Sequence, residues 1–254
     1  HFHPYAPPEA HVDPSAWVAP DAVVEGARIE AFAWVGPGAF VGAGTLVESG
    51  AVIGTNATVG ADCRLMPNSV VMNGCQLGDR VWLNPGAVVG GEGFGFAPSA
   101  EGHMKIPQAG TVVVGDDVEV GANSCIDRAA LETTHVRTGA KLDNLVQVGH
   151  AADVGEGALM VAYSGVAGST RIGRGVVLAA KAAVLGHLNI GDRVQVGVAS
   201  AVISDVGSDQ KVTGVPAIPH RRWLRSASHF GGLTELAKTV RSLEKRIKEL
   251  EDAT

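Results

Sequence analysis

His150 is the residue of this sequence best suited to acid–base chemistry. It lies in the stretch VQVGHAADVG (146–155), between Val148 and Val154, which are six residues apart and each followed by glycine. If the two valines point into a core, a histidine two residues past Val148 is expected to project away from it. A free imidazole titrates near neutral pH, so a projecting histidine could take a proton from an attacking amine.

Two other roles of His150 must be weighed against that of a base. A histidine can fill a core, but here the inward positions are already taken by aliphatic side chains. It can also bind zinc with two further histidines, as in γ-class carbonic anhydrases. His135 and His187 are available, yet their offsets of 15 and 37 residues from His150 give no shared geometry. We therefore expect no metal site.

A six-residue repeat runs through most of the chain and must position His150. Aliphatic residues recur at this spacing in two long runs and two short ones: Ile29, Val35, Val41, Val47, Ile53, Val59, Leu65, Val71, Leu77, Leu83 and Val89; Val136, Leu142, Val148, Val154, Met160, Val166, Ile172, Leu178, Val184, Ile190, Val196 and Val202; Val12, Val18 and Val24; Val114, Val120 and Ile126. A period of six is not helical, and it fits a short strand plus a turn.

Three such units make one triangular coil, so that each aliphatic stacks on its counterpart three repeats later, as Val148 on Val166. The repeat therefore predicts an all-β solenoid over residues 12–205, a parallel β-helix that resembles the left-handed hexapeptide class. Residues 1–11 are expected to be a linker. Residues 90–111 break the period, and we expect them to form an inserted loop. Long insertions of this kind often carry functional residues. A smaller excursion is expected at DRAALETT (127–134), where the spacing is ten.

Residues 206–254 are expected to form a C-terminal extension with a helix over about 229–251. Within it, apolar residues step by three and four, which is the a/d seam of a coiled coil: Leu233, Leu236, Val240, Leu243, Ile247 and Leu250. So short a helix is not stable alone, so we expect it to pack against copies of itself or against the solenoid. An oligomer follows from the first alternative.

The triangular coil also gives His150 its expected neighbours. Gly168 should stack one coil along, about 5 Å away, where its N–H could stabilise an oxyanion or simply serve a turn. His187, two coils and one residue along, could line the same groove. Asp143, seven residues before His150, could orient the imidazole or cap a turn, and both readings are open. For Asn144 a turn cap is at least as well supported as a functional role.

Six motifs occur in order along the chain: GGEGFGFAP (90–98), KIPQ (105–108), IDRAAL (126–131), DNLVQVGH (143–150), VLGH (184–187) and GVPAIPHRRW (214–223). Together they resemble the UDP-3-O-acylglucosamine N-acyltransferase family. The resemblance implies transfer of a 3-hydroxyacyl group, carried on the 4'-phosphopantetheine of acyl carrier protein, to the 2-amino group of UDP-3-O-acylglucosamine in lipid A biosynthesis. It also implies a homotrimer with no bound cofactor.

The same resemblance assigns roles to individual residues. His150 matches the general base of the family, with Asp143 and Gly168 beside it. We expect substrate contacts from His187, Asn144, Phe94 and Gly93. Phe94, an aromatic residue between glycines of the inserted loop, could instead contact a neighbouring subunit or anchor the loop. The positive charges of Arg221, Arg222 and Arg225 could pair with the acidic acyl carrier protein. For Arg221, Arg222 and Arg225 the alternative is a solvated surface.

The chain departs from the family pattern at several positions. Ala151 stands where Asn is common after the histidine, Ala129 replaces the Gly of DRG, and Glu92 replaces the Asp of DGFGF. Family members carry an N-terminal uridine-binding domain, and this chain begins where the linker leaving that domain would lie. The resemblance thus implies that the chain lacks that domain. A CoA-dependent sugar acetyltransferase and a non-catalytic trimeric scaffold are the alternatives.

Charge and cysteine content indicate which binding partners and which cellular compartment to expect. The net charge of −6 combines −10 over residues 1–210, +6 over residues 211–250 and −2 from Glu251 and Asp252. A basic C-terminal segment indicates either a surface for an acidic partner or a solvated helix face. Nucleic acid is the less favoured partner, because no aromatic residues interleave the basic ones in the helix. No apolar run is long enough to span a membrane. Three scattered cysteines predict the reducing cytoplasm.

Overall fold

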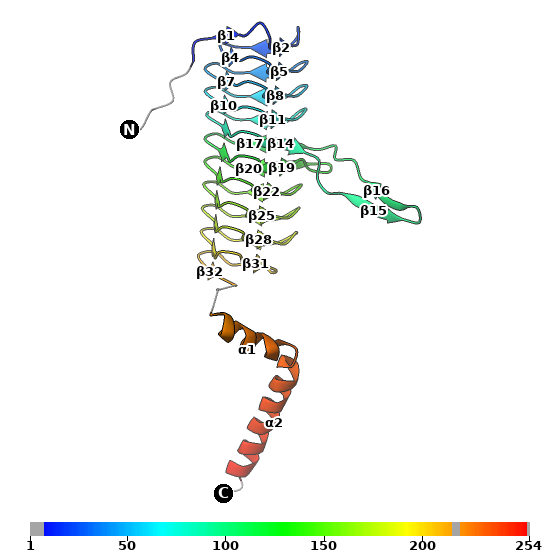
Figure 1. The fold of residues 1–254 in the computed structure, drawn as a ribbon, viewed down its shortest axis with the longest axis vertical. Coiled ribbons are helices and arrows are strands. Elements are labelled where there is room, and N and C mark those ends of the chain that lie inside the picture. Colours follow the sequence, from blue (N-terminus) through cyan, green and yellow to red (C-terminus); the bar gives the residue numbers. More distant parts are fainter. Residues whose placement is uncertain (1–7, 215–218, 253–254) are drawn as a thin grey trace, which may run out of the picture. The chain divides into compact units, whose positions relative to one another are not determined.

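The computed structural model describes residues 8–214 and 219–252, which fall into two compact units on either side of residue 215. Of the linker expected over residues 1–11, residues 1–7 lie outside the described residues. The first unit is a stack of short parallel strands arranged in three sheets (Figure 1). The predicted left-handed parallel β-helix is confirmed.

The three sheets form the three sides of a prism, and successive strands pass from one sheet to the next. The first sheet contains β1 (His11–Val12), β4 (Arg28–Ile29), β7 (Leu46–Val47), β10 (Arg64–Leu65), β13 (Trp82–Leu83), β18 (Glu119–Val120), β21 (Lys141–Leu142), β24 (Leu159–Met160), β27 (Val177–Leu178), β30 (Gln195–Val196) and β32 (Lys211–Val212). The second contains β2 (Trp17–Val18), β5 (Trp34–Val35), β8 (Val52–Ile53), β11 (Val70–Val71), β14 (Val88–Gly91), β19 (Cys125–Asp127), β22 (Gln147–Val148), β25 (Gly165–Val166), β28 (Ala183–Val184) and β31 (Ala201–Val202). The third contains β3 (Val23–Val24), β6 (Phe40–Val41), β9 (Thr58–Val59), β12 (Gln76–Leu77), β17 (Thr111–Val114), β20 (Thr133–Val136), β23 (Asp153–Val154), β26 (Arg171–Ile172) and β29 (Asn189–Ile190).

Each aliphatic of the repeat stacks on its counterpart in the next coil. In the second sheet, Val148 pairs with Val166 and Val166 with Val184, and all three side chains are at most 3% exposed. Complete burial of one such side chain contributes about 1.5–3 kcal/mol, whereas a two-residue strand has no stability of its own. Stacking of coils therefore holds the prism together. Val12 departs from the pattern at 46% exposed, because β1 is the outermost strand of its sheet.

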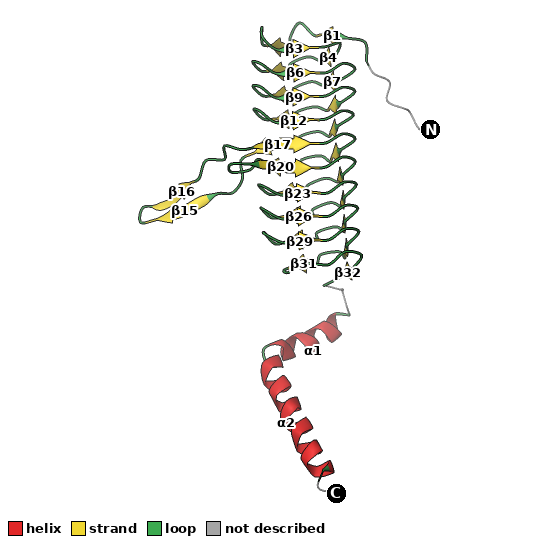
Figure 2. Ribbon diagram, turned by 180° about the vertical axis from the view of Figure 1, so that it is seen from behind, coloured by secondary structure: helices red, strands yellow, loops and turns green. Residues whose placement is uncertain are grey.

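The inserted segment 90–111 contains regular structure that the sequence did not predict. It extends from the prism as an antiparallel hairpin of β15 (Phe96–Ser99) and β16 (Gly102–Lys105), seen from two sides in Figures 1 and 2. Its base is tied to the prism by Arg128, whose Nε donates to the carbonyl of Gly90 at 2.9 Å. Arg128 lies in the expected excursion after β19, so the two interruptions of the repeat contact each other.

The second unit contains two helices, α1 (His220–Phe230) and α2 (Leu233–Glu251). The apolar seam predicts one helix over about 229–251, but α1 begins before that seam, where the sequence shows no period. Pro219 occupies the N-cap of α1, where a missing N–H costs no helical hydrogen bond. No helix in the described ranges is both long and apolar enough to cross a membrane.

Candidate active site

A hollow of about 610 Å³ lies where the inserted segment leaves the prism. The segment contributes five residues to its lining: Glu92, Gly93, Phe94, Phe96 and Lys105. The prism contributes the ends of three neighbouring strands of the second sheet, with the side chains of Asp127, Gln147 and His150 and the backbone of Gly168. Four residues that the sequence singled out, His150, Gly168, Gly93 and Phe94, therefore lie together.

The turn after β22 explains why His150 points outward. Val148 is fully buried, and two residues later the chain turns through Ala151, whose φ is +55°. The turn is held by Thr134, whose Oγ1 accepts the Ala151 N–H at 2.8 Å, and by the His150 carbonyl, which accepts the Ser169 N–H at 2.8 Å. His150 itself is half-buried at the wall of the hollow.

Gly168 lies directly against the imidazole of His150. The strands before them, β22 and β25, pair with the register expected of successive coils. A Cβ placed on Gly168 would lie 2.6 Å from Cε1 and 2.8 Å from Cδ2 of His150. Any side chain at this position would displace the ring, so the ring orientation depends on glycine here.

The N–H of Gly168 donates no hydrogen bond to the described residues, unlike matching groups in other coils. At the second residue after an inward aliphatic, the N–H commonly meets a side-chain oxygen from the next coil. The Thr55 N–H donates to Asn73 Oδ1 at 2.9 Å, and the Arg174 N–H to Asp192 Oδ1 at 2.9 Å. Gly168 is followed one coil later by Gly186, which has no side chain to offer. Its N–H is therefore available to a ligand.

Asp127 is a lining residue that the sequence analysis missed. Its Oδ2 accepts a hydrogen bond of 2.9 Å from Nε2 of Gln147. Burial raises the pKa of Asp127, and the Gln147 hydrogen bond and the positive charges of His150 and Lys105 partly offset that rise. The six-residue repeat does not predict this position. In an unbroken repeat Ile126 would pair with Asn144, but the excursion after β19 makes it pair with Val148.

The inserted segment is held over the hollow by contacts of its own. Lys105 Nζ lies 2.8 Å from Glu92 Oε2, and this ion pair lowers the pKa of Glu92. Lys105 Nζ also lies 5.2 Å from the ring centroid of Phe96, which packs edge-on against Phe94 at 5.0 Å. Phe94 is nevertheless 88% exposed, so it presents an apolar ring at the rim.

Gly93 is wedged between the segment and the base of the hollow. A Cβ placed on Gly93 would lie 2.9 Å from Oε1 of Gln108 and 3.0 Å from Cβ of His150. Gln108, which ends the KIPQ motif, is 7% exposed, and its Nε2 donates to the Ile106 carbonyl at 3.1 Å. Glycine at 93 thus allows the segment to lie close to His150.

Asp143 and Asn144 do not reach the hollow within this chain. They follow β21 at a different corner of the prism, because each repeat spans one side. The carboxylate of Asp143 accepts the N–H of Asn144 at 2.7 Å and that of Ala162 at 3.0 Å. Asn144 Oδ1 accepts the Ala122 N–H at 2.6 Å. In this chain both side chains cap turns, which is the alternative that the sequence analysis left open.

His187 is absent from the hollow lining, and the three arginines belong to the second unit. His187 follows β28, is exposed, and donates its N–H to the Gly168 carbonyl at 3.1 Å. Arg221, Arg222 and Arg225 all lie on α1 in the second unit, where they are exposed.

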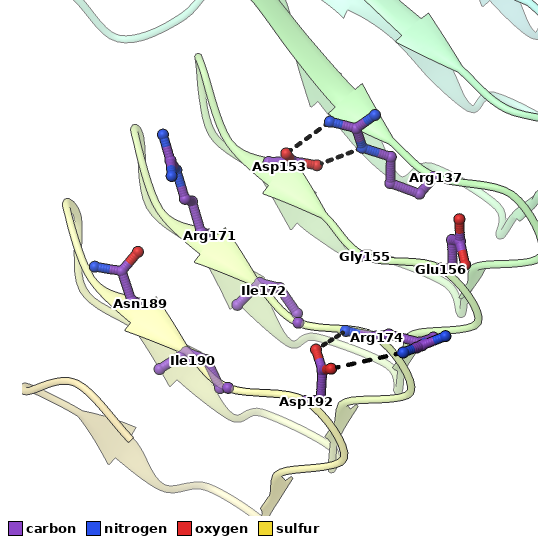
Figure 3. Close-up of a pocket in the computed structure, with 12 residues that line it drawn as sticks. Arg137, Asp153, Gly155, Glu156, Arg171, Ile172, Arg174, Asn189, Ile190 and Asp192 are labelled. Atoms are coloured by element: carbon purple, nitrogen blue, oxygen red, sulfur yellow. Dashed lines mark hydrogen bonds and ion pairs between the residues drawn. The ribbon is translucent and has the colours of Figure 1, made fainter. Parts of the chain in front are cut away.

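A second hollow, of about 420 Å³, lies over the third sheet and is lined by charged residues (Figure 3). Arg137 makes two hydrogen bonds of 2.8 Å with Asp153, and the Arg174 N–H donates to Asp192. These charges largely pair with one another, and no histidine lines this hollow. Within residues 8–214 and 219–252, no three His, Cys, Asp or Glu side chains are grouped to hold a metal ion.

Comparison with known proteins relates this chain to acyltransferases. The family model "Bacterial transferase hexapeptide (six repeats)" matches residues 56–91. The UDP-3-O-acylglucosamine N-acyltransferase of Anaeromyxobacter dehalogenans (strain 2CP-1) is 51% identical in an alignment over 195 residues that covers 74% of this chain and 55% of that protein. The resemblance to UDP-3-O-acylglucosamine N-acyltransferases is confirmed. The protein of this name from Syntrophotalea carbinolica is 59% identical over 165 residues, covering 65% of this chain and 48% of that one.

The chain thus spans about half the length of the N-acyltransferases that it matches. Solved structures support the fold alone. The UDP-N-acetylglucosamine O-acyltransferase of Moraxella catarrhalis RH4 aligns with a TM-score of 0.62 at 19% identity, covering 91% of each chain. A further UDP-N-acetylglucosamine acyltransferase aligns with a TM-score of 0.63 at 18% identity, covering 90% of this chain and 82% of the other.

Proposed function

We propose that this chain transfers a 3-hydroxyacyl group from acyl carrier protein to the 2-amino group of UDP-3-O-acylglucosamine, with His150 as the general base. The observation that carries the proposal is the contact between the His150 ring and Gly168 inside a hollow. A base and an available backbone N–H side by side are what acyl transfer from a thioester needs. The names of the relatives supply the substrate, and the family resemblance supplies the donor.

The reaction follows from these two groups. The amine nitrogen of the sugar bonds to the thioester carbon while His150 takes the N–H proton. The carbonyl oxygen, now an oxyanion, accepts a hydrogen bond from the Gly168 N–H. The C–S bond then breaks, the carbonyl re-forms as an amide, and the imidazolium of His150 returns its proton to the departing pantetheine sulfur. Atoms and charge balance without a bound cofactor or metal.

The residues at the rim of the hollow would contact the acyl donor and its acyl chain. Phe94 and Gly93 would contact the bound substrate, because Phe94 offers an exposed ring there and Gly93 lies against His150. Arg221, Arg222 and Arg225 would pair with acidic side chains of acyl carrier protein. His187, Asp143 and Asn144 would act on the substrate or on His150 only if a neighbouring subunit brings them to the hollow.

A homotrimer would provide such neighbours, and two surfaces support it. The outer column of the second sheet is apolar over several coils, and its Trp17 and Trp34 rings stack 5.0 Å apart. The six seam residues of α2 are each 44–57% exposed. Three helices with this spacing could bury them together. We also place the reaction in the cytoplasm, in keeping with the free thiols of Cys63, Cys75 and Cys125.

The test is an N-acyl transfer assay with UDP-3-O-acylglucosamine as acceptor. We expect amide product with 3-hydroxyacyl-acyl carrier protein and none with acetyl-CoA. Product with acetyl-CoA alone would favour a sugar acetyltransferase of the same fold. No product with either donor, from a correctly folded protein, would contradict the proposal and favour a scaffold.

A further inference from the structure

Asp127 occupies a position from which it can act on His150. Their strands, β19 and β22, are neighbours in the second sheet, and Ile126 pairs directly with Val148. Both residues therefore leave the same edge of the sheet, and both line the same hollow. Burial raises the pKa of Asp127, and the Gln147 hydrogen bond and then the charge of His150 oppose part of that rise.

The carboxylate of Asp127 has a free oxygen, unlike that of Asp143. Gln147 donates to Oδ2 of Asp127, whereas Oδ1 makes no hydrogen bond with the described residues. In Asp143, by contrast, both oxygens accept backbone N–H groups of the turns. Of the two described carboxylates that line this hollow, Glu92 is already paired with Lys105, whereas Asp127 has no ion-pair partner and keeps an available oxygen.

We propose that Asp127, held by Gln147, is the positioning residue for His150, whose carboxylate balances the positive charge that the imidazole carries while it holds the amine proton. This inference rests on the function proposed above. A carboxylate in this role orients the ring and stabilises the imidazolium without itself taking the proton. It acts through His150 and need not touch the substrate.

The surrounding charges are consistent with this role. The charged and titratable groups near Asp127 come from every element around it. They are His150 after β22, Lys105 at the end of β16, Glu92 after β14, Arg128 after β19 and the thiol of Cys125. Lys105 already pairs with Glu92, and Arg128 donates to the carbonyls of Gly90 and Asn73. His150 is the remaining cation-forming group that faces the hollow beside Asp127.

The direct test measures the protonation of His150 without requiring turnover. Diethyl pyrocarbonate modifies histidine only when its imidazole is neutral, and mass spectrometry of the peptide containing His150 follows the reaction at that residue as a function of pH. In Asp127→Asn we expect the midpoint of modification to fall by about half a pH unit or more, because a nearby anion favours the imidazolium. Asp127→Glu, which keeps the charge, should return the midpoint toward that of the unchanged protein.

Asp192→Asn is the matched comparison, since it removes a carboxylate that lines the other hollow, over the third sheet. We expect it to leave the midpoint in place. An unchanged midpoint in Asp127→Asn would overturn the inference, and so would an equal shift in Asp192→Asn. A melting curve and circular dichroism show that each variant is folded.

Acyl transfer provides the second readout. Asp127→Asn should lower kcat and move the acidic limb of the pH–rate profile to lower pH, whereas a merely structural change would lower the rate without moving that limb. If no variant and no unchanged protein transfers an acyl group, the proposed function fails. The modification experiment would still decide whether Asp127 acts on His150, so the two failures are distinguishable.

Discussion

The imidazole of His150 lies against the α-carbon of Gly168, one coil further along the second sheet, with no room for a side chain between them. This contact fixes the ring where the N–H of Gly168 is also exposed to a ligand. The contact predicts what happens when Gly168 is replaced by alanine.

Gly168→Ala should reduce acyl transfer by about 100-fold or more, because the new methyl group displaces the ring from its working position. The fold should survive, since the ring can rotate away. Steady-state kinetics and a melting curve check the two statements. Gly165→Ala is the control, because a Cβ there would meet its nearest atoms at ordinary distances of 3.7 and 3.9 Å. Equal activity of both variants would contradict the prediction.

Ala151→Asn should stabilise the protein by roughly 0.5–1 kcal/mol. Ala151 has φ +55°, a conformation that costs less for asparagine than for alanine. Equilibrium unfolding in urea measures the effect. Ala179→Asn, directly after β27 at a residue without positive φ, should give no gain, and a similar gain at both sites would refute the argument.

The six-residue repeat was sufficient to predict the prism, because each unit repeats the same burial. It also located Gly168 correctly against His150. Asp127 escaped prediction because the excursion after β19 lengthens that coil, whereas an unbroken repeat would place Glu132 one coil before His150. The hairpin β15–β16 and the helix α1 do not follow the repeat, and local pattern alone did not reveal them. Asp143 and Asn144 match the family motif, but the corner they occupy depends on the fold.

Asp127→Asn should make the protein more stable at neutral pH. Burial raises the folded-state pKa of Asp127 above its value of 3.8 in an unfolded chain, so the ionised form is disfavoured by folding. The penalty is fully present above the folded-state pKa and disappears as pH falls below about 3.8. The gain from asparagine should stay under about 1 kcal/mol, because water still screens the group.

Urea unfolding at pH 7.5 and at pH 3 measures this difference. We expect the variant to be the more stable protein at the higher pH and to match the unchanged protein at the lower one. Asp153→Asn is the contrasting control, because Arg137 lowers the pKa of Asp153, so this change should destabilise at neutral pH. A loss of stability in Asp127→Asn at pH 7.5 would contradict the account.

Leu243→Lys should weaken self-association by about tenfold or more, because it places a charge in the apolar seam of α2. Sedimentation equilibrium over a range of concentrations measures the effect. Ser242→Lys introduces the same charge just outside the seam and should leave association unchanged. If Leu243→Lys associates as well as Ser242→Lys, the seam does not join copies of the chain.

The most direct test of the central claim is the rate of N-acyl transfer by His150→Ala, with 3-hydroxyacyl-acyl carrier protein as donor. We predict a loss of about 100-fold to 10,000-fold in kcat, with part of the rate restored by added imidazole, which can occupy the vacated place beside Gly168. A variant that transfers the acyl group as fast as the unchanged protein would contradict the assignment of His150 as the base.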